Sequence, residues 1–457
     1  MEGFMQLNSA INSFVWGPIM LLLLVGTGIY LTWGIKFISI TRLGYVMKNT
    51  LFKMFQKEEK GEGEITAFQA VATALAATVG TGNIAGVATA IALGGPGAIF
   101  WMWLSAVFGM ATKYAEVVLA VKYREKTDDG RFIGGPMYYI QNGLKWKWLA
   151  VIFAIFGSLA AFGIGNMTQA NSVAASLEVT FGVPVLITGI VLAILVAIVV
   201  IGGLKRIASV TEKLVPFMAA LYILGGIFII IMNASHIPEA FGLIFKHAFT
   251  PTAAAGGFAG ATIAMSMRFG VARGVFSNEA GLGSAPIAHA AATTDHPGRQ
   301  GLWGIFEVFM DTIVICSITA LSIMVSGLWD TGVTGAALTT AAFNESIMGG
   351  GYIVSIGIML FAFSTLLSWE YYGERCAEYL FGPKAIMPYR IVWIPFVVLG
   401  AIGSLELIWD VADTLNGLMA IPNLIGILGL SGVVIAETKD FFKREKELNA
   451  IKHNQRS

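Results

Sequence analysis

The sequence predicts an all-α polytopic protein that crosses a membrane many times. Of its 457 residues, 56% are hydrophobic and only 12% are charged, whereas soluble domains carry about 25% charged residues. The mean hydropathy is +0.74. Eleven apolar stretches are each long enough to span the hydrocarbon core of a bilayer. These observations leave little room for a soluble domain.

Short polar connections separate the eleven stretches. The expected transmembrane helices are 14–35, 66–94, 97–121, 148–181, 183–202, 208–232, 258–289, 301–327, 351–381, 386–404 and 411–436. Basic residues concentrate on the cytoplasmic side of membrane proteins. Of the 29 Lys and Arg residues, 25 fall on one side, Lys246 falls on the other and three lie within spans. We therefore expect a plasma (inner) membrane protein with its N-terminus outside and its C-terminus in the cytoplasm.

The composition gives little support to other classes of protein. The formal net charge is +1, so no basic field indicates a nucleic-acid partner. Cys316 and Cys376 both lie in apolar stretches and form no pattern of spacings, which indicates neither a disulfide framework nor a metal site. The N-terminal segment has no basic region before the first apolar stretch, which argues against a cleaved signal peptide.

The ten spans after the first fall into two sets of five. Residues 14–35 form an extra N-terminal helix, residues 66–232 the first set, residues 258–436 the second set and residues 437–457 a cytoplasmic tail. Because five is an odd number, the second set must be inverted relative to the first. Inverted repeats occur in many secondary transporters, whose substrate sites lie near the bilayer midplane.

A helix break is expected in the first span of the first set. Gly80, Gly82, Thr78, Thr81 and Asn83 weaken a helix where hydrocarbon offers backbone groups no other partner. Such a break is tolerated where the freed groups face a cavity and bind something polar. The alternative is that the glycines only let another helix pack closely. The threonines and Asn83 favour a binding site.

The first span of the second set contains a similar interruption at residues 266–274. Breaks in corresponding helices of two inverted halves are a strong sequence indication of a midplane site. Coincidence is the alternative, because the chain contains 54 glycines. We expect Ser266, Phe269 and Gly270 to belong to the substrate site.

Three stretches resemble the alanine/glycine:cation symporter family. They are TVGTGN at 78–83, GGPGAIFWMWL at 94–104 and RGVFSNEAGLGSAP at 273–286. The resemblance covers essentially the whole chain and implies the fold of the leucine transporter (LeuT), a five-plus-five inverted repeat with two discontinuous helices, plus one extra N-terminal helix. It also implies uptake of alanine or glycine coupled to sodium, or in some members to protons. Arg268 departs from the wider pattern, which has a small residue at that position.

An amino-acid substrate needs donors for its carboxylate and acceptors for its ammonium group. The N–H groups of Gly80, Thr81 and Gly82 are expected to face the carboxylate, because a half-helix N-terminus carries unpaired donors and a partial positive charge. Carbonyls freed between Ser266 and Phe269 are candidates for the ammonium group. Phe269 either limits the size of the substrate side chain or is ordinary packing.

Sodium is a hard cation and prefers oxygen ligands. The resemblance to the wider fold implies one sodium site, in which the hydroxyls of Ser364 and Thr365 join the carbonyls of Phe361, Ala76 and Val79. The alternative is that both hydroxyls bond to carbonyls of their own helix.

Further polar residues in the spans have open roles. Thr78 and Asn83 contribute either to the substrate site or to a second ion site. Asn166 and Gln169 are three residues apart and share a helix face. Their amides either line the substrate pocket or bond to a neighbouring helix.

Charged residues within a membrane are costly and are usually paired or functional. Lys113 is expected to pair with Glu116, which is three residues away. Asp311 is expected to pair with Arg268 or Arg273, and a role in cation coupling or a proton step is the alternative.

Three other ionisable residues lie toward the cytoplasmic side. Glu370 and Glu374 suggest a gate formed with a basic residue. His289 is expected to be a polar anchor near the inner membrane face rather than a proton relay.

The sequence thus predicts a sodium-coupled symporter that imports alanine and/or glycine by alternating access. Sodium is the coupling ion, and no other cofactor is expected; the partners are the amino acid, Na+ (or H+) and the bilayer, and the oligomeric state is open. The main alternative is proton coupling through Asp311 or Glu307. An intramembrane enzyme is less favoured, because no His-Glu-x-x-His, Gly-x-Ser-x-Gly or metal-ligand motif occurs. A channel or receptor is also less favoured.

Overall fold

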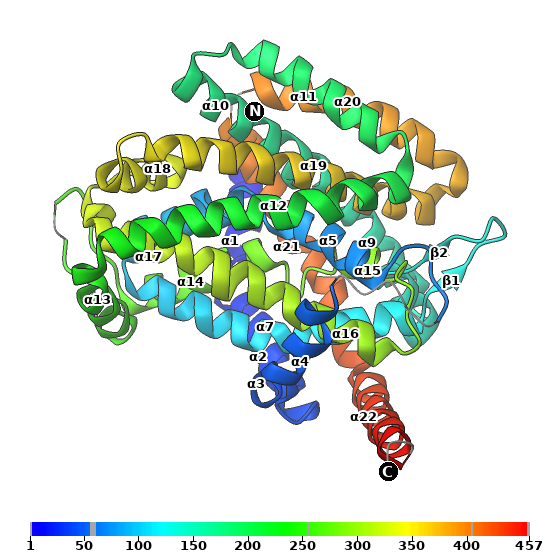
Figure 1. Cartoon of the computed structure of the whole chain (residues 1–457). Helices are drawn as coiled ribbons and strands as arrows, with labels where there is room; N and C mark the ends of the chain where they lie inside the picture. The colour runs from blue at the N-terminus through cyan, green and yellow to red at the C-terminus, as the bar shows by residue number, and fades with distance from the viewer. Residues whose placement is uncertain (1, 55–60, 255, 404, 455–457) are drawn as a thin grey trace.

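The computed structural model describes residues 2–54, 61–254, 256–403 and 405–454 as a bundle of helices (Figure 1). In this view α11 packs on α20 at the upper edge, α12 on α19 below them, and α14 on α7 lower still. The last helix, α22, extends away from the bundle. Lys57, Lys60 and Arg456, three of the predicted cytoplasmic charges, lie outside the described residues, as does the end of the predicted tail.

The chain is almost entirely helical in its described part. The α-helices are α1 (Glu2–Val15), α2 (Pro18–Gly34), α3 (Ile38–Thr41), α4 (Leu43–Asn49), α5 (Ala67–Thr78), α6 (Ala85–Gly94), α7 (Gly97–Lys122), α8 (Pro136–Tyr139), α9 (Lys147–Ala160), α10 (Thr168–Phe181), α11 (Val185–Val200), α12 (Gly203–Met232), α13 (Ile237–Phe249), α14 (Ile263–Asn278), α15 (Pro286–His289), α16 (Pro297–Val308), α17 (Ser317–Ser326), α18 (Gly335–Ser346), α19 (Gly350–Phe381), α20 (Ile386–Ile402), α21 (Leu405–Gly429) and α22 (Ser431–Asn454).

Shorter elements connect or interrupt these helices. The 3-10 segments are η1 (Leu51–Lys53), η2 (Thr81–Asn83), η5 (Ala234–His236), η7 (Leu328–Asp330) and η8 (Pro383–Ala385), and the π-helical segments are η3 (Ile140–Leu144), η4 (Ala161–Met167) and η6 (Phe309–Cys316). Strands β1 (Glu125–Lys126) and β2 (Phe132–Ile133) pair antiparallel.

Within the described residues, eight helices are long and apolar enough to cross a membrane, and a ninth span results if the bent pair formed by α5 and Thr81–Gly94 is counted as one. Two expected spans are shorter than predicted. The stretch 183–202 contains α11, and the stretch 258–289 contains α14; each of these helices has 16 residues. The total of eleven spans and the inverted five-plus-five layout therefore stay predictions.

The predicted break in the first span of the first set is confirmed. α5 ends at Thr78, and the helical segment Thr81–Gly94 continues at an angle of 58° to it. α5 begins with a reciprocal cap, in which Gln69 N donates to Thr66 Oγ1 at 3.0 Å and Thr66 N donates to Gln69 Oε1 at 3.1 Å. Such a capping box satisfies two backbone donors that a helix start leaves free.

The second break lies elsewhere than predicted. α14 runs without interruption from Ile263 to Asn278, so the interruption predicted at 266–274 is wrong. The helix ends where Glu279 adopts a left-handed φ of 56°, and irregular backbone continues to α15. Gly281 and Gly283, with φ of 94° and 87°, form the turns of this second break, because glycine adopts positive φ without a steric penalty.

The glycines inside α14 serve helix packing instead. A Cβ atom on Gly270 would overlap the carbonyl oxygen of Ala98 in α7, and one on Gly274 would lie 2.7 Å from Ser105 Oγ. Small residues allow helices in membranes to approach closely. The periodic glycines that suggested a break therefore mark the α7 contact.

Two clusters of buried apolar side chains meet at α5 and α19. Leu366 and Leu367 of α19 belong to one cluster, and Ile358 and Phe361 belong to the other. α5 is divided in the same way between both clusters. The first break and the hydroxyl-bearing part of α19 therefore lie at the boundary between the two packed bodies of the protein.

Replacing Gly270 with alanine is expected to lower stability. The added Cβ would force α14 and α7 apart, which costs about 1–3 kcal/mol for overpacked sites. Gly86→Ala in α6 is the matched control, because a Cβ at that position meets nothing within 4 Å. Thermal unfolding of the purified protein in detergent should show a lower midpoint for Gly270→Ala alone. Equal midpoints for the two variants would contradict the packing role.

Candidate functional site

A small cavity lies at the first break, and we call it the central cavity. Its walls come from α5, α10, α14, α19 and α21 together with the two breaks and η4. The lining residues are Ala77, Thr78, Gly80, Gly82, Ile164, Gln169, Phe276, Glu279, Thr365, Trp369 and Asn416. Segments far apart in the sequence therefore enclose one space beside an interrupted helix.

The first break contains backbone donors without an acceptor in the described chain. Gly80 N donates to Asn83 Oδ1 at 2.9 Å, so this amide is not free for a ligand, contrary to expectation. Within the described chain, the amides of Thr81 and Gly82 have no acceptor, and the buried Thr81 hydroxyl has no partner. Two of the three amides predicted to face a carboxylate therefore remain available.

Gly80 allows α19 to approach the break closely. A Cβ atom at this position would lie 2.8 Å from Thr365 Oγ1 and 3.6 Å from Gln169 Oε1. The first distance is shorter than an ordinary van der Waals contact. Only glycine leaves the space between the break, Thr365 and Gln169 open.

The predicted sodium ligands largely converge. Ser364 Oγ donates to Ala76 O at 3.1 Å and to Phe361 O at 2.8 Å, and Thr365 Oγ1 lies 3.0 Å from each of the same two carbonyl oxygens. The hydroxyls thus bond to a carbonyl of their own helix and also contact α5 across the interface, and their role as sodium ligands stays a prediction. The N–H of Val79 donates to Leu75 O at 2.8 Å, and no contact joins the Val79 carbonyl to the hydroxyl pair in the described structure.

The two amides predicted on one helix face differ in role. Gln169 lines the central cavity, where its Nε2 donates to Ile164 O at 2.9 Å and its Oε1 has no partner. Asn166 Nδ2 donates to Trp393 O of α20 at 2.9 Å. Gln169 thus belongs to the cavity, and Asn166 connects helices.

The residues predicted around the second break lie away from the central cavity. Ser266 Oγ donates to Gly94 O, and the Phe269 ring lies under the Arg268 guanidinium, 5.7 Å from its carbon atom. Neither these residues nor Gly270 line the cavity. The geometry gives them packing contacts because α14 is unbroken at this point.

Glu279 was not among the predicted site residues. Its Oε1 accepts from Trp369 Nε1 at 2.9 Å, and its Oε2 accepts from Ser284 Oγ. The residue is 4% exposed and lines the central cavity. Its signal in the sequence is the pair of glycines that follows it, since Gly281 and Gly283 indicate the true break.

Asp311 connects the first break to the last turn of α14. Asn83 Nδ2 donates to its Oδ1 at 2.6 Å, and Ser277 Oγ donates to its Oδ2 at 2.9 Å. The predicted ion pair with Arg268 or Arg273 is wrong, because no basic side chain of the described chain lies within ion-pair distance of Asp311. Both arginines instead line a second small cavity together with Asp413.

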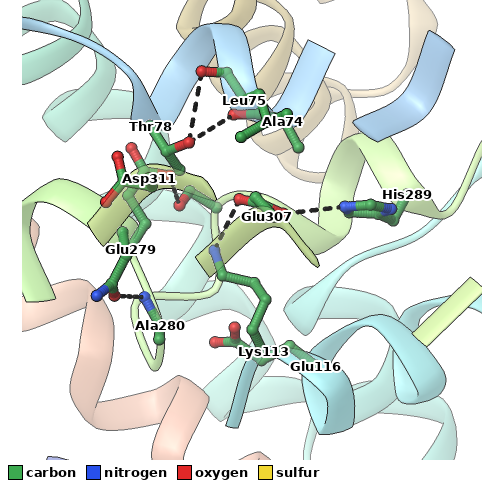
Figure 2. Close-up of polar contacts among 12 residues, drawn as sticks. Ala74, Leu75, Thr78, Lys113, Glu116, Glu279, Ala280, His289, Glu307 and Asp311 are labelled. Atoms are coloured by element: carbon green, nitrogen blue, oxygen red, sulfur yellow. Dashed lines mark hydrogen bonds and ion pairs between the residues drawn. The ribbon is translucent and has the colours of Figure 1, made fainter. Parts of the chain in front are cut away.

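A buried charge cluster lies beside the second break (Figure 2). Lys113 Nζ contacts Glu307 Oε1 at 3.2 Å, and His289 Nε2 lies 3.1 Å from Glu307 Oε2. The predicted pairing of Lys113 with Glu116 is therefore wrong, because Glu116 Oε1 accepts from Gly281 N at 3.1 Å and from Asn423 Nδ2 at 2.6 Å. His289 is fully buried and is not a surface anchor.

Glu374, one of the two acidic residues predicted to form a gate, lines a charged cleft of about 620 Å³, and Glu370 does not. Glu374 Oε2 accepts from Arg390 Nε at 2.6 Å, and Glu374 Oε1 accepts from Arg375 at 2.5 Å. The predicted basic partner of Glu374 therefore exists. Both carboxylate oxygens of Glu370 are buried without a partner.

Glu64, in the connection before α5, also lines the charged cleft beside Glu374. Burial raises the pKa of its carboxyl group.

A bundle of apolar helices with a broken helix beside a small cavity is the arrangement found in membrane transporters of the LeuT fold. The fold is similar to that in the crystal structure of MhsT in complex with L-phenylalanine, with a TM-score of 0.52 and 13% identity over 84% of this chain and 99% of that chain.

The chain belongs to the sodium:alanine symporter family, whose profile matches residues 1–455. It is 57% identical to the sodium/alanine symporter AgcS of Methanococcus maripaludis, over 96% of this chain and 97% of the relative. It is 40% identical to the probable sodium/glutamine symporter GlnT of Bacillus subtilis, over 95% of this chain and 90% of the relative.

Gly80→Ala is expected to abolish the space between the first break and α19. The added methyl group would push against Thr365, so binding of labelled alanine should weaken by at least about tenfold, in line with the cost of overpacking. Gly86→Ala, in the second half of the same broken helix, should bind as the unmodified protein does. Unchanged binding by Gly80→Ala would place the ligand elsewhere.

Proposed function

We propose that this protein is a symporter that couples inward movement of sodium to the import of alanine and/or glycine. The observation that carries the proposal is the convergence of the Ser364 and Thr365 hydroxyls on the Ala76 carbonyl, at a break that also borders the central cavity. An ion held at this point would touch the same backbone segment that binds the substrate.

The central cavity supports a small substrate. Ile164, Phe276 and Trp369 are bulky and line it together with the break. Amides at the first break suit a carboxylate, since oriented backbone N–H groups with a partial positive charge favour anions. A relative is named as a probable glutamine symporter, so glutamine is the competitor to test. These side chains favour alanine or glycine over glutamine.

The proposed sodium site consists of the oxygens of Ser364, Thr365, Ala76 and Phe361, with the carbonyl of Val79 as the fifth ligand. Oxygen ligands of this kind suit a hard cation. Asn83 and Asp311 are candidates for a second ion, because the buried Asp311 carboxylate joins the first break to the end of α14 and has no basic partner among the described residues.

Alternating access would follow from movement of one set of helices against the other. In this proposal residues 66–232 and 258–436 form the two inverted halves, the N-terminus lies outside and the C-terminus lies in the cytoplasm of the cell. The charged cleft beside Glu374 and Arg390 would then lie on the cytoplasmic route from the cavity.

The second candidate is proton coupling at Asp311. It is favoured by the neutral surroundings of this carboxylate, whose partners are Asn83, Ser277 and Thr312. A carboxylic acid can alternate between charged and neutral forms in such a place.

Uptake of labelled alanine into proteoliposomes tests the coupling ion. We expect accumulation above the external concentration under an inward sodium gradient and none when choline replaces sodium at constant pH. Uptake that follows an inward proton gradient without sodium would contradict sodium coupling and support Asp311. Failure to accumulate alanine or glycine under either gradient would contradict the proposed substrate.

Thr365→Ala is expected to weaken sodium dependence. Loss of one ligand oxygen should raise the half-saturating sodium concentration by roughly tenfold, as expected for one lost charge-assisted contact. Alanine affinity at saturating sodium should change much less. Ser368→Ala is the control. It removes another hydroxyl of α19, which is buried and has no partner in the described chain. A larger effect on alanine than on sodium would assign Thr365 to the substrate.

A further inference from the structure

Glu279 ends α14 in a backbone conformation that its side chain does not favour. Its φ of 56° lies in the left-handed region, which costs a non-glycine residue about 1–2 kcal/mol. Glycine would adopt it without this cost, and the chain uses glycine at similar positions two and four residues later. Glu279 occupies this strained position although glycine would fit it without strain. Strain of this kind is found at functional sites, so we infer that the carboxylate side chain has a function there.

The direct hydrogen-bond partners of the Glu279 carboxylate are neutral. Trp369 Nε1 and Ser284 Oγ donate to its two oxygens, and no basic nitrogen in the described chain lies within ion-pair distance of it. Lys113, the buried base of α7, is already paired with Glu307 at 3.2 Å. A buried charge inside a membrane without a counter-ion is costly and by default functional.

Two further acceptors in the cavity wall lack a donor in the described chain. Gln169 Oε1 and Asn416 Oδ1 are buried and unpartnered, and both residues line the central cavity with Glu279. An ammonium group carries three N–H donors. The three side chains together offer one charged and two neutral acceptors for such a group.

The opposite kind of group lies at the first break. The amides of Thr81 and Gly82 are donors without an acceptor in the described chain, and Gly82 lines the same cavity. The cavity thus offers donors from one broken helix and acceptors from the other elements. This arrangement matches a zwitterion, with its carboxylate at the first break and its ammonium group toward the second.

We propose that Glu279 is the counter-ion of the substrate's ammonium group and makes a free α-amino group a requirement for binding. The inference rests on the proposed function and deepens it. It assigns the ammonium group to a side chain, whereas the sequence suggested the carbonyls between Ser266 and Phe269, which belong to a continuous helix. Gln169 and Asn416 complete the acceptor set as neutral partners.

Binding of labelled alanine to the purified full-length protein at saturating sodium tests this role. Glu279→Gln keeps the length of the side chain and an acceptor for Trp369 but removes the charge. We expect its affinity for alanine to fall by roughly 10- to 100-fold, as for loss of a hydrogen-bonded charge. Ser284→Ala removes a contact to the same carboxylate without removing its charge, and should cause a smaller loss.

Competition by propionate, which is alanine without its amino group, separates recognition from structural support. In the unmodified protein propionate should compete far more weakly than alanine. In Glu279→Gln this difference should shrink, because the contribution of the amino group is lost. A purely structural role would weaken both ligands alike and leave their ratio unchanged, and this outcome would overturn the inference.

Alanine binding by the unmodified protein distinguishes a failure of the proposed function from a failure of the role of Glu279. If the unmodified protein binds no alanine at saturating sodium, the proposed function fails. If it binds alanine and Glu279→Gln binds equally well, only the role of Glu279 fails. Thermal unfolding without ligand should give similar midpoints for both proteins, and a large fall for the variant would instead support a structural role.

Discussion

Where a membrane helix is interrupted, its backbone N–H and C=O groups lose their helical hydrogen bonds and need other partners. The polar contacts inside this protein follow from that constraint. Hydrocarbon supplies no such partners, and each unsatisfied group costs several kcal/mol. At the first break, the Ser364 and Thr365 hydroxyls contact the Ala76 carbonyl. At the second break, Glu116 accepts from the Gly281 amide and Asn423 donates to the Gly281 carbonyl at 2.8 Å.

The buried charges follow from the same constraint. Glu116 is fully buried and acts mainly as an acceptor for an interrupted backbone rather than as the partner of a lysine. Lys113 pairs with Glu307, which joins α7 to α16. Asp311 contacts Asn83 of the first break and Ser277 at the end of α14. A side chain of η6 therefore links the first break to the end of α14.

The sequence was sufficient to predict the membrane class and the first break. Gly80, Gly82 and the neighbouring threonines weaken a helix in the middle of an apolar span, so the local signal was strong. The hydroxyl pair of α19 came from resemblance, and the structure brings it to the Ala76 carbonyl.

The second half of the site could not be predicted in the same way. Glycines at 270 and 274 suggested a break, but their function is close packing on α7, and packing partners are not visible in a sequence. The break signalled by Gly281 and Gly283 falls after an acidic residue, and its meaning depends on Trp369, which is 90 residues away. The partners of Lys113 and Asp311 were likewise decided by helices distant in sequence.

Thr365 has a consequence for energy conversion. Its hydroxyl contacts the Ala76 carbonyl of the proposed ion site, and the same oxygen limits the space at Gly80 in the cavity wall. Two ligands that share one wall atom cannot bind independently. Thermodynamic reciprocity then requires that whatever factor sodium contributes to amino-acid affinity, the amino acid contributes to sodium affinity. In the proposed symporter, coupling through this shared oxygen atom would disfavour slippage, which is the movement of either solute alone. Such coupling needs no conformational change between distant sites.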